Sequence, residues 1–146
     1  MEIRIKWYNG SMIIDLEKFL SCRSITKVKK LVNIIRDSHT PECEGQIRRF
    51  IEQELEQYEP RQKEASRYIV GYTEKVKFCE KQLDNCISSR DRFKRKSDGW
   101  EHYNSHVKAF RDELKEMKAA LRSYQRKSDN EKKNRDFYMK VLEIIT

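Results

Sequence analysis

Residues that break helices are scarce in this sequence, which has four glycines and two prolines among 146 residues. So little glycine and proline favours long helices and argues against a β-rich or disordered chain. Long apolar runs are missing as well: none approaches the ~20 residues of a membrane-spanning helix, and no apolar signal-peptide segment follows Met1. We therefore expect a cytoplasmic protein with no membrane partner.

The four cysteines lack the spacing of a metal site. None stands in a C-x-x-C pair, so a zinc site is not expected. Cys79 and Cys86 are one heptad apart, roughly 10 Å at helical rise, which is too far for a disulfide. We expect both to be reduced and to lie in the core as small apolar side chains.

Catalytic motifs are absent from the sequence. It has no glycine-rich phosphate loop, no G-x-S-x-G and no cysteine with a recognisable histidine partner. His102 and His106 stand four residues apart, but no H-E-x-x-H pattern surrounds them. Glu52, Glu54 and Glu56 fit the solvated face of a helix better than a catalytic cleft. We expect a protein that is not an enzyme, with no catalytic residue, no cofactor and no metal.

A long heptad pattern is what the sequence does contain. Mostly apolar residues recur at alternating spacings of four and three through two stretches, which are interrupted at Asp98-Gly99. Each helix of this kind leaves an apolar stripe that a partner helix must cover. The pattern predicts a long antiparallel helical hairpin with its turn near residues 97–101, whose arms pair within one chain or swap between two. The seam residues are Ala65, Ile69, Tyr72, Val76, Cys79, Leu83, Cys86, Arg90 and Phe93, then Tyr103, Val107, Phe110, Leu114, Met117, Leu121 and Tyr124.

The first residues have a different pattern. Ile3, Ile5 and Trp7 alternate with polar residues, and Asn9-Gly10 then precedes a second apolar run. Asn-Gly between such runs predicts a β-hairpin with a type I′ turn, in which both turn residues take positive φ. A helical face with Ser24 as its N-cap follows and is expected to stop near residues 37–38. Residues 1–38 are thus expected to form a small ββα head.

Residues 39–146 are expected to form the helical hairpin. Thr40 is the predicted cap of a helix that Pro60 ends or kinks, and the first long arm then runs to about Ser97. The second arm starts near Trp100, and its seam fails between residues 125 and 136. Folding back around Gly99 would place residues 138–140 opposite Pro60, so the apolar C-terminal turns pack back towards the head. The predicted fold class is mainly α, with an N-terminal β-hairpin and helix head followed by a long antiparallel coiled-coil hairpin.

The formal net charge is +8, and two basic clusters contribute much of it. The first, which we call the tip cluster, lies at the expected turn of the hairpin. Its cations neutralise phosphates, and its aromatic residues stack on bases or anchor a partner. The alternatives are an acidic protein surface as partner, or a solvated helix end whose cations complement the helix dipole. The tip cluster consists of Arg90, Arg92, Phe93, Lys94, Arg95, Lys96 and Trp100.

The second basic cluster lies where the seam of the second arm becomes polar. It is a further candidate for partner binding, and the alternative is a charged coiled-coil face that pairs with Glu64 and Glu74 on the other arm. Exposed pairs of that kind stabilise little. The cluster consists of Arg122, Arg126, Lys127, Lys132, Lys133 and Arg135.

These features predict a small basic interaction protein that binds or occludes a nucleic acid or a nucleic-acid-binding protein complex through its hairpin tip. In size, charge and expected shape the chain resembles small non-enzymatic proteins of phages and mobile elements. That resemblance implies an inhibitor of a host defence complex. The competing hypothesis is a structural coiled-coil module for dimerisation or assembly, in which the chain forms a homodimer and the charges supply only solubility.

Overall fold

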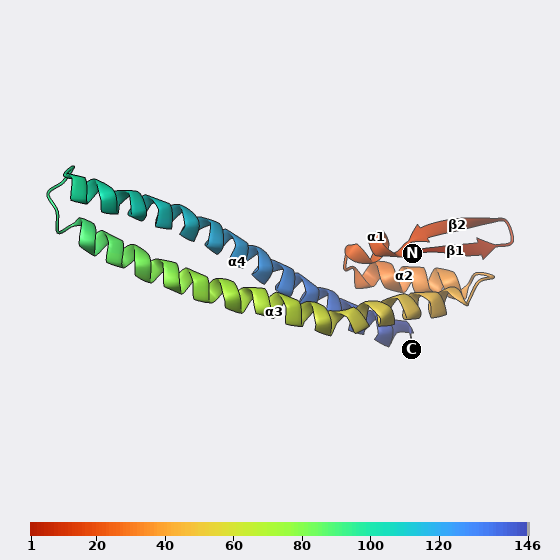
Figure 1. The fold of residues 1–146 in the computed structure, drawn as a ribbon. Coiled ribbons are helices and arrows are strands. Elements are labelled where there is room, and N and C mark those ends of the chain that lie inside the picture. Colours follow the sequence, from red (N-terminus) through yellow and green to blue (C-terminus); the bar gives the residue numbers. More distant parts are fainter. Residues whose placement is uncertain (146) are drawn as a thin grey trace. The chain divides into compact units, whose positions relative to one another are not determined.

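The computed structural model describes residues 1–145 and contains two strands and four helices. The chain is mainly helical, with a small N-terminal β-hairpin and a long antiparallel helix pair, which confirms the predicted fold class (Figure 1). No helix in residues 1–145 has an apolar stretch that could cross a membrane. The elements are β1 (Glu2–Trp7), β2 (Gly10–Asp15), α1 (Leu16–Ser21), α2 (Ile25–Arg36), α3 (Cys43–Arg90) and α4 (Asp98–Ile145).

The chain forms two compact units. Residues 1–61 together with 130–145 make the first, which we call the terminal unit. Residues 62–129 make the second, which we call the hairpin unit. Helices α3 and α4 both pass through the two units, and each unit is described by itself below.

The β-hairpin is confirmed, but its predicted turn type is wrong. The strands pair antiparallel with Ile5 opposite Met12 and Trp7 opposite Gly10, so the two loop residues are Tyr8 and Asn9. Among residues 1–145, positive φ values belong to Arg23 and Lys96 and to none of the loop residues. A type I′ turn needs two positive φ values. Gly10 is therefore the first residue of β2 and not a turn residue.

The outer edge of β1 is covered by residues 39–43. The Lys6 N–H donates to Thr40 Oγ1 (3.2 Å), and the His39 N–H donates to the Lys6 carbonyl (2.9 Å). The Cys43 thiol donates to the Arg4 carbonyl (3.3 Å). The sequence predicted that Thr40 caps the following helix. Its side chain instead binds the backbone of β1, so this prediction is wrong. α3 begins at Cys43 after a turn in which the Cys43 N–H donates to the Thr40 carbonyl (3.1 Å).

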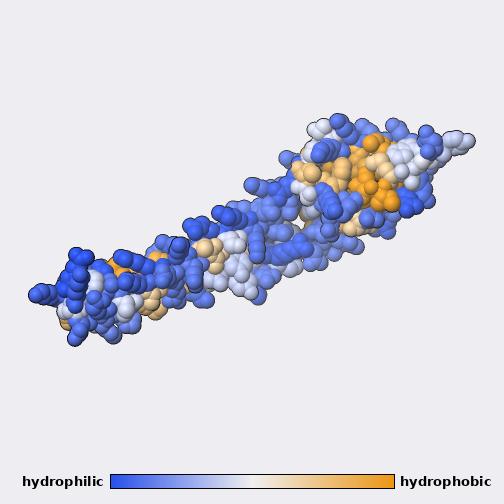
Figure 2. Space-filling model, turned by 90° about the horizontal axis from the view of Figure 1, so that it is seen from above, coloured by the Kyte–Doolittle hydropathy of each residue, from blue (hydrophilic) through white to orange (hydrophobic). Residues whose placement is uncertain are grey.

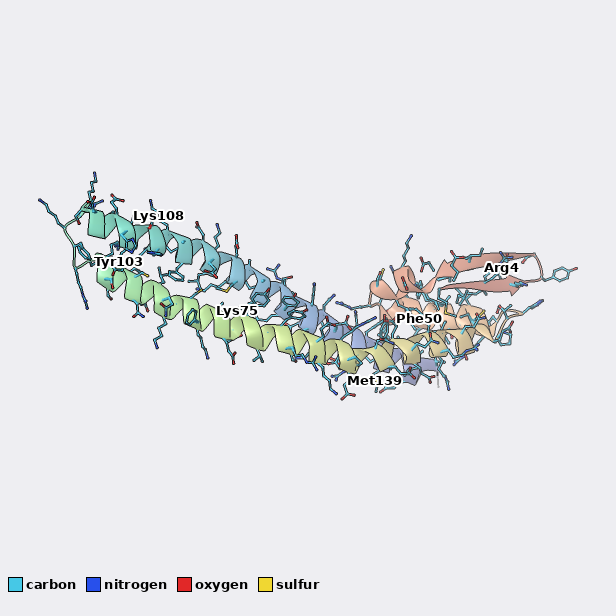
Figure 3. The ribbon with its side chains drawn as sticks, in the orientation of Figure 1. Arg4, Phe50, Lys75, Tyr103, Lys108 and Met139 are labelled. Carbon is cyan, nitrogen blue, oxygen red and sulfur yellow. The ribbon has the colours of Figure 1, made fainter. Side chains whose placement is uncertain are left out.

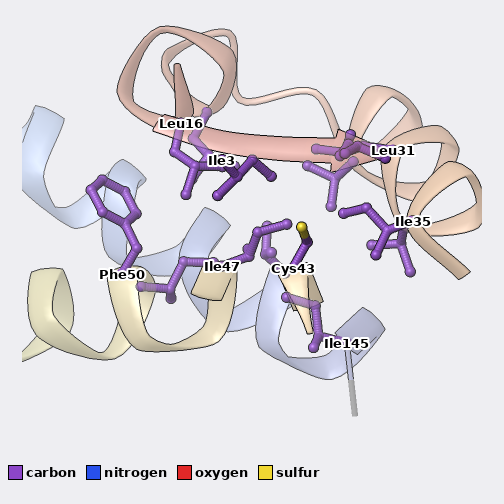
Figure 4. Packing of buried hydrophobic residues seen from close by; sticks show 14 of the residues in the cluster. Ile3, Leu16, Leu31, Ile35, Cys43, Ile47, Phe50 and Ile145 are labelled. Carbon is purple, nitrogen blue, oxygen red and sulfur yellow. The ribbon is translucent and has the colours of Figure 1, made fainter. Parts of the chain in front are cut away.

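One apolar core holds the terminal unit together (Figure 4). Ile3 and Ile5 of β1 point into it, and α2 contributes one apolar face, capped at its start by Ser24 as expected. The last turns of α4 close the same core. Fully burying one such aliphatic side chain stabilises a protein by about 1.5–3 kcal/mol. The buried residues are Ile3, Ile5, Leu16, Leu20, Val28, Leu31, Val32, Ile35, Cys43, Ile47, Phe50, Ile51, Phe137, Val141 and Ile145.

Pro60 does not end its helix, because α3 continues through it. The segment opposite Pro60 also differs from the expected residues 138–140. Arg61 contacts Glu131 (3.8 Å), and the guanidinium of Arg135 lies 4.8 Å from the centre of the Tyr58 ring. α3 ends at Arg90, well before Gly99. The connection is therefore centred earlier in the sequence, which shifts the alignment of the two arms by several residues.

The polar stretch of α4 has polar partners in the terminal unit. Arg23, in the loop between α1 and α2, has a left-handed φ of 49°. Its Nε donates to Asn134 Oδ1 (2.7 Å), and its Nη2 donates to Asn130 Oδ1. Asn130 and Asn134 stand one helical turn apart and share a face of α4. The expected seam positions in this stretch, Glu131 and Arg135, instead contact Arg61 and Tyr58 of α3, so Arg23 binds the helix face next to the seam.

The heptad seam is confirmed in the hairpin unit. Its best-covered layer joins Val76 and Cys79 of α3 to Met117 of α4, with Tyr72, Phe110 and Leu114 packed around them. Val107 is fully buried nearer the turn. At the other end the seam was expected to fail at Ser128, yet this residue is 8% exposed. The Ser128 hydroxyl donates to Gln62 Oε1 (2.9 Å), and Gln62 Nε2 donates to the Ser128 carbonyl (3.1 Å).

Candidate nucleic-acid interface

The turn of the hairpin unit covers residues 91–97, earlier than the predicted 97–101. The Phe93 N–H donates to the Arg90 carbonyl (3.1 Å), and the Ser97 N–H donates to the Lys94 carbonyl (3.0 Å). Lys96 takes a left-handed φ of 67°. The Ser97 hydroxyl accepts from the Trp100 N–H (3.4 Å). Ser97, expected to end the first arm, instead precedes α4 and caps its first turn.

Phe93 fixes the turn onto the start of α4. Its ring stacks on Tyr103 with centroids 5.8 Å apart and planes at 26°, and Tyr103 lies between the helices at this end of the unit (Figure 3). A Cβ on Gly99 would lie 2.4 Å from Phe93 Cδ1. Gly99, which the sequence placed at the turn, has no positive φ and lies in the first turn of α4. It is a helical residue whose missing side chain makes room for the phenyl ring.

Arg90 also supports the turn, and its guanidinium group has three partners within the hairpin unit. Its Nε donates to Asp91 Oδ1 (3.1 Å), and its Nη1 donates to Asn104 Oδ1 (3.0 Å). The guanidinium lies 5.6 Å from the centre of the Trp100 ring. The Arg90 side chain is 18% exposed. Arg90 and Trp100 are thus packed together beneath the turn, whereas the sequence grouped them with the binding residues.

The four remaining cations of the tip cluster face solvent. Arg92, Lys94, Arg95 and Lys96 are all exposed, and within residues 1–145 none of them forms an ion pair. Phe93 stands among them and is 45% exposed. Four positive charges within five consecutive residues repel one another, and a polyanion bound across the turn removes that repulsion. The structure therefore brings together the charges that the sequence assigned to this site.

Two supporting residues of the turn were missed by the sequence reasoning. Asn104 lies one position after the seam residue Tyr103, and Asp91 interrupts the basic run. Each accepts one hydrogen bond from Arg90. The seam position of Arg90, where an apolar residue is usual, was the signal that this arginine has partners across the hairpin.

The two histidines near the turn contact each other. His102 and His106 meet edge to face with ring centroids 4.9 Å apart, and His102 also contacts Tyr103 edge to face at 5.2 Å. Both histidines are exposed. Throughout the described part of the chain, no three side chains of the metal-binding types lie close enough together to hold an ion.

The half of the second basic cluster that belongs to the hairpin unit lies beside stacked tyrosines. Tyr68 and Tyr124 stack with centroids 4.6 Å apart, and Lys127 Nζ lies 5.3 Å from the centre of the Tyr124 ring. Burial raises the pKa of the Tyr124 phenol, and Tyr68, Tyr72 and then Glu64 raise it further. Arg122 and Arg126 are exposed on the same helix. This half of the second cluster is therefore a basic helix face beside a pair of stacked tyrosines.

The remaining half belongs to the terminal unit. Lys132 and Lys133 are exposed, whereas Arg135 contacts Asp136 (3.3 Å) and lies over the ring of Tyr58. The expected pairing of the second cluster with Glu64 and Glu74 is wrong. Among residues 1–145 the ion pairs between the arms join Arg61 to Glu131 (3.8 Å) and Lys118 to Glu80 (3.4 Å).

Comparisons with protein-family models, with curated proteins and with solved structures give no match.

Proposed function

We propose that the protein is a non-enzymatic interaction protein that binds a nucleic acid or a nucleoprotein complex through the exposed cations of its hairpin turn. One observation carries the proposal. Arg92, Lys94, Arg95 and Lys96 are exposed and form no ion pair with any of residues 1–145, on a turn that Phe93 and Arg90 hold in place.

A fixed turn binds better than a flexible basic tail of the same charge. Ordering a chain on binding costs about 1–2 kcal/mol per residue in backbone entropy. Phe93 packs on Gly99 and Tyr103, so the turn is already ordered in the folded protein and loses little further entropy on binding. The exposed part of the Phe93 ring offers a surface on which an unpaired base stacks, a contact worth about 1–3 kcal/mol. Single-stranded segments therefore fit the turn better than a closed duplex.

The first experiment is fluorescence anisotropy with single-stranded DNA, duplex DNA and single-stranded RNA at low and moderate salt. Four phosphate contacts predict a slope of log K against log salt of about −3 for a single strand. The double variant R92E/K94E should abolish binding, and R92Q/K94Q, which removes two of the four contacts, should make the slope less steep by about 1.5. The variant K29E/K30E is the matched control, because it changes the net charge equally on the exposed face of α2.

The binding results distinguish a protein that binds bare nucleic acid from one that binds a nucleoprotein complex. Retained binding by R92E/K94E with unchanged helicity would remove the turn from the interface. Weak binding to every bare strand, together with tight and turn-dependent binding to a nucleoprotein complex, would support an inhibitor of such a complex. No binding to a bare strand or to a complex at low salt would overturn the proposal and leave the cations as a solubilising surface.

A further inference from the structure

The two edges of the β-hairpin differ in what covers them. Three outward backbone groups of β1 have partners, since the Lys6 N–H donates to Thr40, the Lys6 carbonyl accepts from His39, and the Arg4 carbonyl accepts from Cys43. Residues of an antiparallel pair alternate between bonding to the partner strand and pointing away from it. Since Arg4 and Lys6 point away from β2, their partners Ile13 and Ser11 point away from β1.

The outer edge of β2 is open. Within residues 1–145, no hydrogen bond reaches the backbone of Ser11 or Ile13 from outside the hairpin. Met12 and Ile13 at this edge are 36% and 53% exposed. Figure 2 views the molecule from above, the side on which β2 lies in Figure 1, and shows an apolar patch on the terminal unit.

Over residues 10–14, β2 lacks the usual protection of a free edge, and its one charged residue is Asp15 at the end of the strand. Natural edge strands avoid pairing with other chains through lysines, prolines, bulges or a cover. The segment Gly10-Ser11-Met12-Ile13-Ile14 has no charge and no proline, and its register with β1 is unbroken. This lack of protection in a chain that is 38% charged indicates that the edge has a partner.

We propose that β2 pairs antiparallel with β2 of a second copy of the chain, about a two-fold axis at Ile13, to form a four-stranded sheet. Such pairing is self-complementary. It places Met12 opposite Ile14 on one face and Ser11 opposite Asp15 on the other, so no two like charges oppose each other. A partner strand bearing charged side chains would have no complement among residues 10–14, which favours a second copy.

The dimer is expected to dissociate on dilution. One added strand pair buries less than the ~800 Å² per partner of a standard interface. Sedimentation velocity over a concentration series should therefore show a reversible monomer–dimer equilibrium. Dimerisation does not depend on the basic turn, so the charge-reversal variant R92E/K94E should dimerise like the wild type.

Two substitutions at Ile13 test the edge without disturbing the hairpin. Ile13→Pro removes an N–H that points away from β1, so the β1–β2 ladder keeps its hydrogen bonds. Ile13→Lys places two ammonium groups together at the two-fold axis. Both should give monomers with unchanged circular dichroism. Ile34→Lys is the control, because it places the same charge on an apolar residue that is 37% exposed on α2 and not in either strand.

A cross-link tests the register. Opposite residues of a hydrogen-bonded antiparallel pair have Cα atoms about 5.5 Å apart, which is within disulfide range. In a Cys22→Ser background, which removes the exposed native thiol, Ile13→Cys should give a disulfide-linked dimer on oxidation. Ser11→Cys should not, because two copies of residue 11 would lie about 14 Å apart in this register.

Three results would overturn the proposal. The first is a monomer at every concentration up to the solubility limit. The second is a dimer that both Ile13 variants retain, which would place the interface elsewhere, for instance between swapped helical arms. The third is equal cross-linking of the Ile13→Cys and Ser11→Cys variants, which would exclude a two-fold axis at Ile13.

Discussion

Gln62 and Ser128 exchange two hydrogen bonds across the hairpin unit, one of them from the serine hydroxyl to the glutamine carbonyl oxygen at 2.9 Å. They form a polar pair at the end of a mostly apolar seam. An apolar heptad seam tolerates a slip of seven residues, because the pattern repeats. A hydrogen-bonded pair is satisfied in one alignment only. Gln62 and Ser128 therefore select the register of the two arms.

A double-mutant cycle at this pair should show coupling. Ser128→Ala leaves Gln62 Oε1 without its donor, and the loss of a hydrogen bond at this half-buried position costs about 0.5–1.5 kcal/mol. Combining it with Gln62→Leu removes both polar groups, so the double variant should be more stable than the sum of the single effects by about 0.5–3 kcal/mol. Urea unfolding measures both quantities. Gln125→Ala, at an exposed position of α4, is the control, and strict additivity would contradict the proposed pairing.

The effect of Gly99→Ala on stability should be destabilising in the wild type and stabilising in a Phe93→Ala background. In the wild type the added Cβ collides with Phe93 and displaces a ring whose stacking on Tyr103 contributes about 0.5–1.5 kcal/mol. In a Phe93→Ala background the collision is gone, and alanine gains up to about 1 kcal/mol over glycine in a helix. Thermal unfolding of the four variants measures the reversal. A stabilising effect of Gly99→Ala in both backgrounds would show that Phe93 does not pack on Gly99.

The protein should lose stability at high pH partly through Tyr138. Burial raises the pKa of its phenol above the ordinary 10.0, and Glu54, Glu131 and Glu17 raise it further while Arg61 opposes them. A raised pKa means that folding favours the protonated phenol. Its contribution to stability is therefore complete below the ordinary value and is lost as the pH rises above it.

The measurement for Tyr138 is the free energy of unfolding between pH about 9 and 11. Tyr138→Phe should flatten the decline with pH relative to the wild type. Tyr8→Phe should leave it unchanged, because Tyr8 is 96% exposed. Cys79 contributes a decline of the same sign in all variants, since burial and then Glu113 raise the pKa of its thiol. Identical slopes for the wild type and Tyr138→Phe would refute the assignment.

Hydrophobic periodicity was enough to predict the fold class. A heptad stripe as long as that from Ala65 to Phe93 has few structural solutions, and Val76, Cys79, Val107 and Met117 are buried as it requires. Alternation in Ile3 and Ile5 likewise predicted a strand with one buried face. The division into residues 1–38 and 39–146 stays a prediction.

Tertiary contacts determine the features that hydrophobic periodicity did not predict. The Thr40 hydroxyl binds the β1 edge, a partner some thirty residues earlier in the sequence, so its local capping signal was overridden. The turn begins early because Phe93 packs on Gly99 and so leaves the helix, a contact that spacing alone does not reveal. The polar stretch of α4 seemed to end the seam, whereas Arg23 binds it through Asn130 and Asn134.

The charges of the candidate site could be predicted from the sequence. Which of its residues support the turn and which face solvent could not. A run of cations near an expected turn is visible in the sequence. That Arg90 is held by Asp91 and Asn104 while Arg92 faces solvent depends on the exact end of α3. The function and the partner stay predictions.

The core of the terminal unit has a consequence for the order in which the chain folds. It joins Ile3 and Ile5 to Val141 and Ile145, residues from opposite ends of the described sequence. Closing so long a loop directly is entropically costly and slow. The turn at residues 91–97 offers a shorter route, because pairing of α3 and α4 from that turn outwards carries the last turns of α4 back toward the start of α3. Faults at the hairpin turn should therefore delay the folding of the core of the terminal unit.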